Sequence, residues 1–233
     1  GATSTGRPYF VMEYVNGVPI TEYCRTHRLA IGQRIELFQQ ACAAVQHAHA
    51  KGVIHRDLKP NNVLVSNGIE HDAPRLKIID FGIAKSIDAT PTDQTQLTDF
   101  RHFIGTPEYM SPEQAGVSAA DIDTRSDIYS LGVVFYEMLT GATPFDRERL
   151  RSSTFGEVQR IIREEEPPKP STRLLSQSTS RAHNSRDPLR LASRLRGDLD
   201  WIALKALDKD RERRYASAAE FAEDLRRYLG HEP

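Results

Sequence analysis

The chain of 233 residues could form one large domain or two small ones, and its 39% hydrophobic and 27% charged content is ordinary for a globular protein. Its net charge of −1 argues against a broad basic surface for nucleic acid, and it has no apolar run of roughly 18 residues that could span a membrane. We expect no signal peptide, and we expect both cysteines, Cys24 and Cys42, to be reduced packing residues.

The first predicted element is a strand over residues 9–15, which are mostly aromatic and β-branched and contain no proline or glycine. Asn16 and Gly17 follow and are expected to end it. Taken alone, this segment is equally well explained as a strand of any apolar core. Because residue 1 is glycine rather than methionine, we expect the natural start of the protein to lie upstream or to have been removed.

A helix is predicted over residues 31–49, where apolar side chains recur at alternating spacings of four and three and share one face. The residues on this face are Ile31, Ile35, Phe38, Cys42, Val45 and His49. Gly52 is expected to end the helix. His49 is expected to be a hydrogen-bonded core residue, because His47, two positions away, points from another face and the two are poorly placed to share a metal ion.

Residues 55–64 concentrate chemically active side chains between an apolar helix and an apolar strand. Asp57 can accept a proton from a hydroxyl group. Lys59 can neutralise charge on a transferred phosphoryl group, and Asn62 offers a carboxamide oxygen to a hard cation such as Mg²⁺. We interpret this segment as the centre of the functional site.

Two short strands are predicted next, over residues 63–65 and 76–79, joined by a polar loop. Asn62 precedes the first strand and Asp80 follows the second. Pairing of the strands would bring this amide and this carboxylate together, so that both could hold one Mg²⁺ ion.

Residues 83–104 are rich in threonine, aspartate and glutamine and have few apolar side chains, so we expect them to be mobile. They could be a plain solvated loop or a segment that phosphorylation orders. We favour the second interpretation, because Arg56 beside Asp57 can hold a phosphate with both arms of its guanidinium. The sequence does not select one threonine among the candidates.

A second long helix is predicted over residues 126–140, which are apolar on nearly all sides and therefore belong at the centre of a core. Gly141 is expected to cap its C-terminus. Residues 154–157 have the pattern of a capping box and predict a further helix.

Residues 166–196 are predicted to form an exposed, flexible insertion, because prolines interrupt its start and the stretch from Lys169 to Arg196 has seven basic residues and a single acid. A solvated loop is favoured here over a binding patch for an acidic partner. Regular structure is predicted to resume with Asp198 as an N-cap, and a second capping box over residues 217–220 predicts the last helix.

Three motifs follow one another in a defined order: residues 55–64, Asp80-Phe81-Gly82, and residues 105–113. The first has the form H-R-D-x-x-x-x-N of the protein kinase catalytic loop. With all three, the chain resembles the bacterial Ser/Thr protein kinases of the eukaryotic-like type, from the hinge strand to the last helix. This resemblance implies an α+β, protein-kinase-like fold with a mainly helical C-terminal lobe and the last strand of the small-lobe sheet.

The resemblance also implies a division of the chain. Residues 1–18 would be the end of the small lobe and the hinge, and residues 19–230 would be the helical lobe. The backbone of Glu13 and Val15 would hydrogen-bond adenine, and Leu64 would form the floor beneath it.

The resemblance further implies the catalytic residues. Asp57 would orient the acceptor hydroxyl and take its proton, while Lys59 would contact the γ-phosphate of ATP. Asn62 and Asp80 would hold Mg²⁺. Thr106 would hydrogen-bond Asp57 and Lys59 beside the acceptor.

Two supporting contacts are implied as well. Asp127 would hold the backbone of the catalytic loop, and Arg214 would pair with Glu113. The chain departs from the family pattern at Ser111, where the A-P-E motif has alanine, and at Arg211, where a proline is usual. Neither departure changes a charge used in the chemistry, so we expect both to leave activity intact.

The Gly-rich loop and the phosphate-clamping strand lysine of the family have no counterpart in this sequence. We therefore expect the isolated chain to bind ATP poorly and to phosphorylate little. The favoured function is a Ser/Thr protein kinase that uses ATP and Mg²⁺, acts on Ser and Thr hydroxyls of proteins, and autophosphorylates its segment 83–104.

Two other functions remain open: a non-catalytic, pseudokinase-like binding module and a small-molecule phosphotransferase of related fold. The intact acid, lysine and asparagine of residues 57–62 argue against the first, and the presence of residues 105–113 argues against the second. We expect a cytoplasmic location, alone or as part of a membrane-anchored protein, with no nucleic-acid partner and no membrane contact within this chain.

Overall fold

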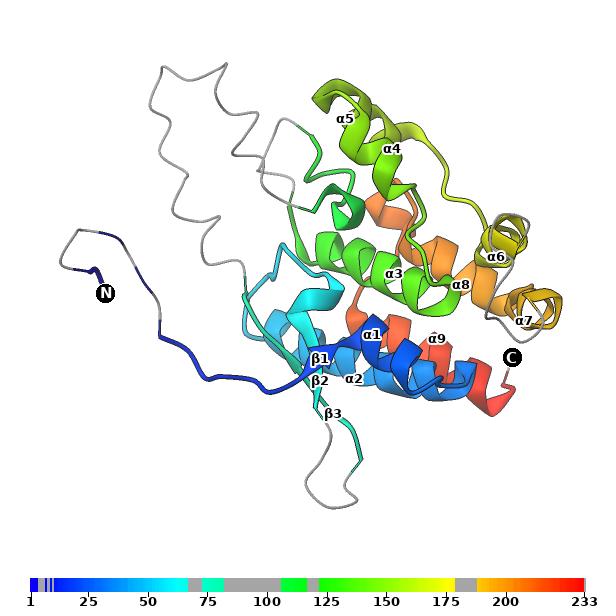
Figure 1. The fold of residues 1–233 in the computed structure, drawn as a ribbon, viewed down its shortest axis with the longest axis horizontal. Helices are drawn as coiled ribbons and strands as arrows, with labels where there is room; N and C mark the ends of the chain where they lie inside the picture. Colours follow the sequence, from blue (N-terminus) through cyan, green and yellow to red (C-terminus); the bar gives the residue numbers. More distant parts are fainter. Residues whose placement is uncertain are drawn as a thin grey trace.

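The computed structural model describes residues 1–3, 7, 9, 11–66, 73–81, 106–116, 122–178 and 188–232. These residues form a mainly helical fold with one small sheet (Figure 1). The strands are β1 (Val18–Pro19), β2 (Val63–Ser66) and β3 (Arg75–Ile78). The α-helices are α1 (Ile20–Thr26), α2 (Ile31–His49), α3 (Thr124–Thr140), α4 (Arg147–Ser152), α5 (Phe155–Glu164), α6 (Pro170–Ser178), α7 (Pro188–Leu195), α8 (Asp198–Ala206) and α9 (Ala218–Gly230). Short 3₁₀ turns cover Pro60–Asn62, Pro107–Tyr109 and Arg211–Arg213.

Helix α3 is the centre of the core, as the apolar run over residues 126–140 predicted. It packs against α2, α6 and α8 (Figure 1). Gly132 allows α8 to approach closely, since a Cβ at this position would lie 2.8 Å from the Cβ of Ala206. The helix begins two residues earlier than predicted, because the Asp123 carboxylate caps its N-terminus by accepting the Arg125 N–H at 2.7 Å. Gly141, with φ 78°, caps its C-terminus as predicted.

Helix α2 confirms the predicted helix over residues 31–49 at both ends. It runs beside α9, and the two helices enclose an aromatic cluster with α3 (Figure 1). The Phe38 ring lies 4.8 Å from that of Phe135 and 5.2 Å from that of Phe221. Cys24 and Cys42 are both free and buried, as predicted. Among the described helices, none is both long enough and apolar enough to cross a membrane.

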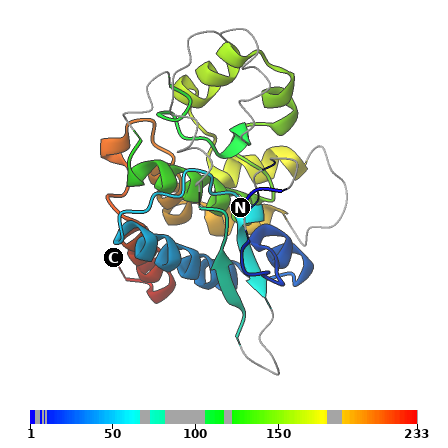
Figure 2. The same ribbon diagram turned by 90° about the vertical axis from the view of Figure 1, so that its left-hand side faces the viewer.

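The sheet has the antiparallel order β1-β2-β3, and its β2–β3 hairpin confirms the two strands predicted around residues 63–65 and 76–79. Val63 pairs with Ile78 at the end of the hairpin that adjoins the catalytic loop. The Ile79 N–H continues this ladder by donating to the Asn62 carbonyl at 2.9 Å. Figure 2 shows the hairpin extending away from the helical core. The sheet therefore fixes the start of the Asp80 segment beside Asn62.

The strand predicted over residues 9–15 is not found in the described part of that segment, which comprises residue 9 and residues 11–15. Val11 and Tyr14 are 89% and 86% exposed, and the first strand is instead the two-residue β1. Strand propensity measures how well a side chain packs on a paired, half-buried sheet. Among the described residues this segment has no strand beside it, so the side chains of Val11, Met12 and Tyr14 remain exposed to solvent.

The prediction of an exposed, flexible insertion over residues 166–196 is wrong for the described residues of that range, which include helices α6 and α7. Pro170 begins α6 rather than breaking it, because the first position of a helix needs no N–H donor. Ser171 is buried, and its backbone N–H and hydroxyl donate to Asp200 of α8 at 2.9 and 2.6 Å. Residues 179–187 lie outside the described residues.

The helix starts near the C-terminus differ in detail from their predictions. Asp198 is the first residue of α8, and Gly197, with φ 99°, occupies the N-cap position that was predicted for Asp198. Thr154 and Ser217 do cap α5 and α9, since their hydroxyls accept the N–H three residues ahead. Both capping boxes are only half formed: the Glu220 carboxylate, for example, accepts from the Ala216 N–H rather than from the cap residue.

Candidate active site

The residues Asp57, Lys59 and Asn62 lie together on the loop between α2 and β2. Lys59 Nζ donates to Asp57 Oδ2 at 2.8 Å. The Asn62 amide nitrogen donates to the Asp57 carbonyl at 2.8 Å and to Asp57 Oδ2 at 3.3 Å. The Asp57 and Lys59 side chains are 27% and 24% exposed, so a ligand can reach both. The loop thus presents an acid, a cation and a carboxamide to the same small volume.

The backbone of this loop is held by one buried carboxylate, Asp127 of α3. Its Oδ2 accepts from the His55 N–H and its Oδ1 from the Arg56 N–H, both at 2.8 Å. The ring of His49, at the end of α2, donates its Nε2–H to Oδ2 at 2.8 Å. These contacts confirm both that Asp127 supports the loop and that His49 is a hydrogen-bonded core residue. A buried carboxylate needs such partners, because an unpaired charge in the interior is very costly.

Two residues of the site have left-handed backbones, which non-glycine residues rarely adopt. Arg56, just before Asp57, has φ 65°, and Asp80 has φ 56°. Each such conformation costs roughly 1–3 kcal/mol and persists only where the surroundings determine it. The two strained positions therefore mark one place on the loop and one after β3 where the surrounding fold determines the backbone.

His55 brings the two acids of the site to one place. Its Nε2–H donates to the Ile79 carbonyl at 2.9 Å, and its Nδ1 accepts the Asp57 N–H at 3.3 Å. Burial lowers the pKa of His55, while the Ile79 carbonyl and the nearby carboxylates of Asp127, Asp57 and Asp80 act to raise it. The same imidazole therefore bonds the backbone of Asp57 and that of Ile79, the residue before Asp80.

Thr106 borders a small cavity whose other walls include Asp57, Leu58 and Tyr109. The structure thus places Thr106 beside the predicted acid. Among the described contacts, however, none is a hydrogen bond from Thr106 to Asp57 or Lys59. Residues 82–105, which contain Gly82, Gly105 and the candidate autophosphorylation segment 83–104, lie outside the described residues.

The predicted adenine contacts are spread over two elements. The Glu13 carboxylate forms an ion pair with Lys77 Nζ of β3 at 2.5 Å, which fastens the N-terminal segment to the sheet. Val15 is half-buried, and Leu64 is a half-buried residue of β2 opposite Pro19. The described contacts do not join Glu13 or Val15 to the catalytic loop.

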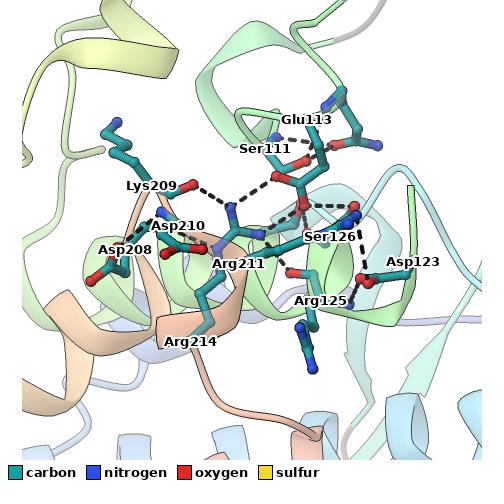
Figure 3. A network of polar contacts seen from close by, with 12 residues as sticks. Ser111, Glu113, Asp123, Arg125, Ser126, Asp208, Lys209, Asp210, Arg211 and Arg214 are labelled. Carbon is teal, nitrogen blue, oxygen red and sulfur yellow. Dashed lines mark hydrogen bonds and ion pairs between the residues drawn. The ribbon is translucent and has the colours of Figure 1, made fainter. Parts of the chain in front are cut away.

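The predicted pair of Glu113 and Arg214 is present and almost fully buried (Figure 3). The guanidinium donates to both carboxylate oxygens, at 2.7 and 2.8 Å, and also to the Arg125 and Asp208 carbonyls. Burial acts to raise the pKa of Glu113, but the Arg214 hydrogen bonds and charge outweigh it and hold that pKa below its usual value. The pair joins the segment after Thr106 to the turn that precedes α9.

The sequence analysis missed a polar cluster at the outer end of α3. The hydroxyl of Tyr109 donates to the Glu137 carboxylate, and Arg147 donates to Glu137 Oε1 at 2.6 Å and to the Tyr109 hydroxyl oxygen at 2.8 Å. Burial, followed by the charge of Glu137, raises the pKa of Tyr109. An acid inside an otherwise apolar helix was the signal that could have revealed this cluster.

The sequence model of the family described as protein kinase domain matches residues 2–224. The chain belongs to the protein kinase domain family. Protein kinases in general use ATP and Mg²⁺. The predicted α+β kinase-like fold is confirmed, and so is the resemblance to the bacterial Ser/Thr kinases.

Two curated relatives of this chain are named as bacterial serine/threonine-protein kinases. The chain is 39% identical to the serine/threonine-protein kinase PknB of Mycobacterium tuberculosis over 227 residues, which are 97% of this chain and 31% of that protein. It is 37% identical to Pkn1 of Myxococcus xanthus over 221 residues, 94% of this chain and 27% of that protein. The solved kinase domain of Mycobacterium tuberculosis PknI superposes with a TM-score of 0.58 at 26% identity, covering 94% of this chain and 65% of that one. The chain thus spans less than a third of the two curated relatives.

Proposed function

We propose that this chain provides the catalytic loop of a Ser/Thr protein kinase that transfers the γ-phosphoryl group of ATP to protein hydroxyls in the cytoplasm. The observation that carries the proposal is the grouping of Asp57, Lys59 and Asn62 on a loop whose backbone Asp127 holds. Phosphoryl transfer depends mainly on positioning and on charge neutralisation. Asp127 fixes the backbone of the loop, which provides positioning, and the partly exposed Lys59 provides a positive charge that a ligand can reach.

Each of the three side chains has a defined task in this mechanism. Asp57 accepts the hydrogen bond of the acceptor hydroxyl and takes its proton as the oxygen attacks phosphorus. The proton ends on Asp57 Oδ1 or Oδ2, and the γ-phosphoryl group leaves ADP for the acceptor oxygen. Lys59, 2.8 Å from Asp57, balances the negative charge of the phosphoryl group and of the carboxylate together.

The side chains also fit a bound Mg²⁺ ion. Because the Asn62 nitrogen is used to donate to the Asp57 carbonyl, its side-chain oxygen is left as a possible ligand. Asp80 is exposed and supplies a carboxylate. Oxygen donors of this kind suit Mg²⁺, which would neutralise charge on the phosphates. Asn62 and Asp80 are therefore the residues that we propose to hold it.

The proposed acceptor is a serine or threonine of a protein. Lys59, two residues after Asp57, and Thr106 at the cavity beside Asp57 support this choice over tyrosine. The threonines of segment 83–104 are proposed as sites of autophosphorylation. The relatives named as serine/threonine-protein kinases support the same substrate class.

The substitution Asp57→Asn in the natural full-length protein tests the proposal. Removing a positioned general base typically lowers the rate by about 10²- to 10⁴-fold, and we expect a loss in this range with an unchanged fold. Transfer of radiolabelled phosphate to a protein acceptor measures the rate, and circular dichroism checks the fold.

Asp224→Asn is a matched control for this experiment. Asp224 of α9 is 21% exposed and lies 3.9 Å from Lys205, so it is also an aspartate beside a lysine, but it is far from the loop in sequence. We expect its variant to retain full activity. A rate for Asp57→Asn within about tenfold of the natural protein would contradict the proposed role of a general base.

A further inference from the structure

Gln114 connects the segment that carries Thr106 to the catalytic loop. Its Nε2 donates a hydrogen bond to the Arg56 carbonyl at 2.8 Å. This carbonyl belongs to the peptide group that links Arg56 to Asp57. The orientation of that peptide group sets the direction in which the Asp57 side chain leaves the backbone.

The Gln114 amide can take only one orientation. Its oxygen accepts from the Ser111 N–H at 3.0 Å and from the Ser111 hydroxyl at 3.2 Å. In a flipped amide, the NH₂ group would face the Ser111 N–H, which is also a donor. The amide oxygen would face the Arg56 carbonyl, which is also an acceptor. Ser111, which is fully buried, replaces the alanine of the A-P-E motif, and its hydroxyl gives Gln114 a contact that alanine lacks.

Arg56 is held on both sides of its strained backbone. Asp127 of α3 accepts its N–H, and Gln114 donates to its carbonyl, each at 2.8 Å. The neighbouring Glu113 is itself fixed by Arg214 (Figure 3). The left-handed conformation at φ 65° is thus held by two residues that lie 58 and 71 positions after Arg56 in the sequence.

We propose that Gln114 is a positioning residue for phosphoryl transfer, because it holds the Arg56–Asp57 peptide in the orientation that aims the Asp57 carboxylate at the acceptor hydroxyl. This inference rests on the proposed role of Asp57. It also implies that a shift of the segment from Thr106 to Gln114 reaches Asp57 through one hydrogen bond.

Two substitutions test the inference in the natural full-length protein. Gln114→Met keeps the length of the side chain and removes both the donor to the Arg56 carbonyl and the acceptor for Ser111. Gln114→Glu keeps the shape and replaces the donor with a carboxylate that faces the Arg56 carbonyl. Gln159→Met is the matched control, because the Gln159 amide also donates to a backbone carbonyl of this segment, that of Ala115, without touching the catalytic loop.

We expect Gln114→Met to lower kcat by about 10- to 100-fold with little change in KM for ATP, because a small misplacement of a catalytic group has effects of this size. Gln159→Met should leave kcat within about twofold of the natural protein. For Gln114→Glu, the ratio of its kcat to that of the natural protein should rise as the pH falls, because a protonated carboxyl group can donate to the Arg56 carbonyl. An unchanged kcat for Gln114→Met, or a pH-independent ratio for Gln114→Glu, overturns the inference.

Hydrogen exchange of the backbone amides of residues 55–58 separates this inference from the kinase function. We expect faster exchange there in Gln114→Met and natural exchange in Gln159→Met. Should Gln114→Met fail to fold, Gln114→Glu serves for the same measurement. Unchanged exchange in the Gln114 variants overturns the inference whatever the activity. If the natural protein itself transfers no phosphate, the proposed kinase function is refuted. Faster exchange in Gln114→Met would even then support the contact between Gln114 and Arg56.

Discussion

The catalytic loop and the N-terminal segment of residues 11–15 reverse the usual relation between polarity and burial. Asp127, which holds the loop, is 0% exposed, and Arg214, which holds Glu113 next to Gln114, is 4% exposed. In the N-terminal segment, the apolar residues Val11 and Tyr14 lie almost entirely in solvent. The difference shows that partners decide where a residue lies in this protein, and that hydropathy alone does not.

Each case follows from what the neighbouring elements supply. Asp127 accepts from two backbone N–H groups and one imidazole, and Arg214 donates to one carboxylate and three backbone carbonyls. Val11 meets no paired strand within the described residues. A buried charge without such partners would cost several kcal/mol, whereas an apolar side chain left in water forgoes only about 1.5–3 kcal/mol. Substitutions in the two regions should therefore differ strongly in their effect on stability.

Of the three test variants Arg214→Met, Asp127→Asn and Val11→Lys, Arg214→Met is expected to lose the most stability. It leaves the Glu113 carboxylate, which is 8% exposed, without its charged partner. Breaking a buried ion pair in this way costs about 3–5 kcal/mol of unfolding free energy, which urea denaturation measures. Arg213→Met is the control, because this neighbour is 73% exposed and its ion pair with Asp208 contributes no more than about 1 kcal/mol. Equal losses in the two variants would contradict the importance of burial.

The pH dependence sharpens this prediction. The folded-state pKa of Glu113 lies below its usual value of 4.5, so its contribution to stability is fully present above pH 4.5 and is lost as the pH falls through the lower folded pKa. The stability difference between the natural chain and Arg214→Met should therefore shrink below pH 4.5. A difference that stays constant from pH 7 to about pH 3 would exclude the ion pair as its source.

A smaller loss is expected for Asp127→Asn. The new amide nitrogen must face at least one of the donors that the carboxylate now accepts, and one unsatisfied buried donor costs roughly 1–3 kcal/mol. Phosphoryl transfer should fall as well, because the loop backbone loses a contact. Thermal and urea unfolding measure the stability. Asp123→Asn at the N-cap of α3 is the control, since asparagine caps a helix about as well as aspartate, and a similar loss there would argue against a special role of Asp127.

The smallest effect on stability is expected for Val11→Lys in the N-terminal segment. Because Val11 is exposed, the unfolding free energy should change by less than about 0.5 kcal/mol. Self-association at high protein concentration, followed by light scattering, should decrease, because the substitution interrupts an exposed apolar run. Val134→Lys, at a fully buried position of α3, should in contrast prevent folding. If Val11→Lys lowered the unfolding free energy as much as Arg214→Met does, the contrast between the buried charges and the exposed N-terminal segment would be refuted.

From the sequence, the site could be predicted only where its residues are close in sequence or follow predicted strands. Asp57, Lys59 and Asn62 are close in sequence, so their grouping on one loop follows from the motif. The hairpin that places the Asp80 segment beside Asn62 was predicted from two apolar runs and is confirmed. The hydrogen bond from Gln114 to Arg56 joins residues that are 58 positions apart. No sequence pattern predicts a single hydrogen bond over such a separation.

The wrong predictions for residues 9–15 and for residues 166–196 have a common cause. Residues 9–15 have strong strand propensity, and residues 166–196 have the prolines and charges of a loop. Both predictions treated a segment as though its own composition decided its structure. The first segment has no strand beside it among the described residues, and in the second Ser171 is anchored to Asp200 of α8.

By itself, the sequence determined helices α2 and α3, the β2–β3 hairpin and the order of the catalytic motifs, because these depend on periodicity and spacing within the chain. Only the tertiary structure decided which charges are buried, that Arg56 adopts a left-handed backbone, and that the described residues 11–15 form no strand. The physical reason is that burial and backbone strain depend on hydrogen-bond partners from distant segments, which are defined only once the chain has folded.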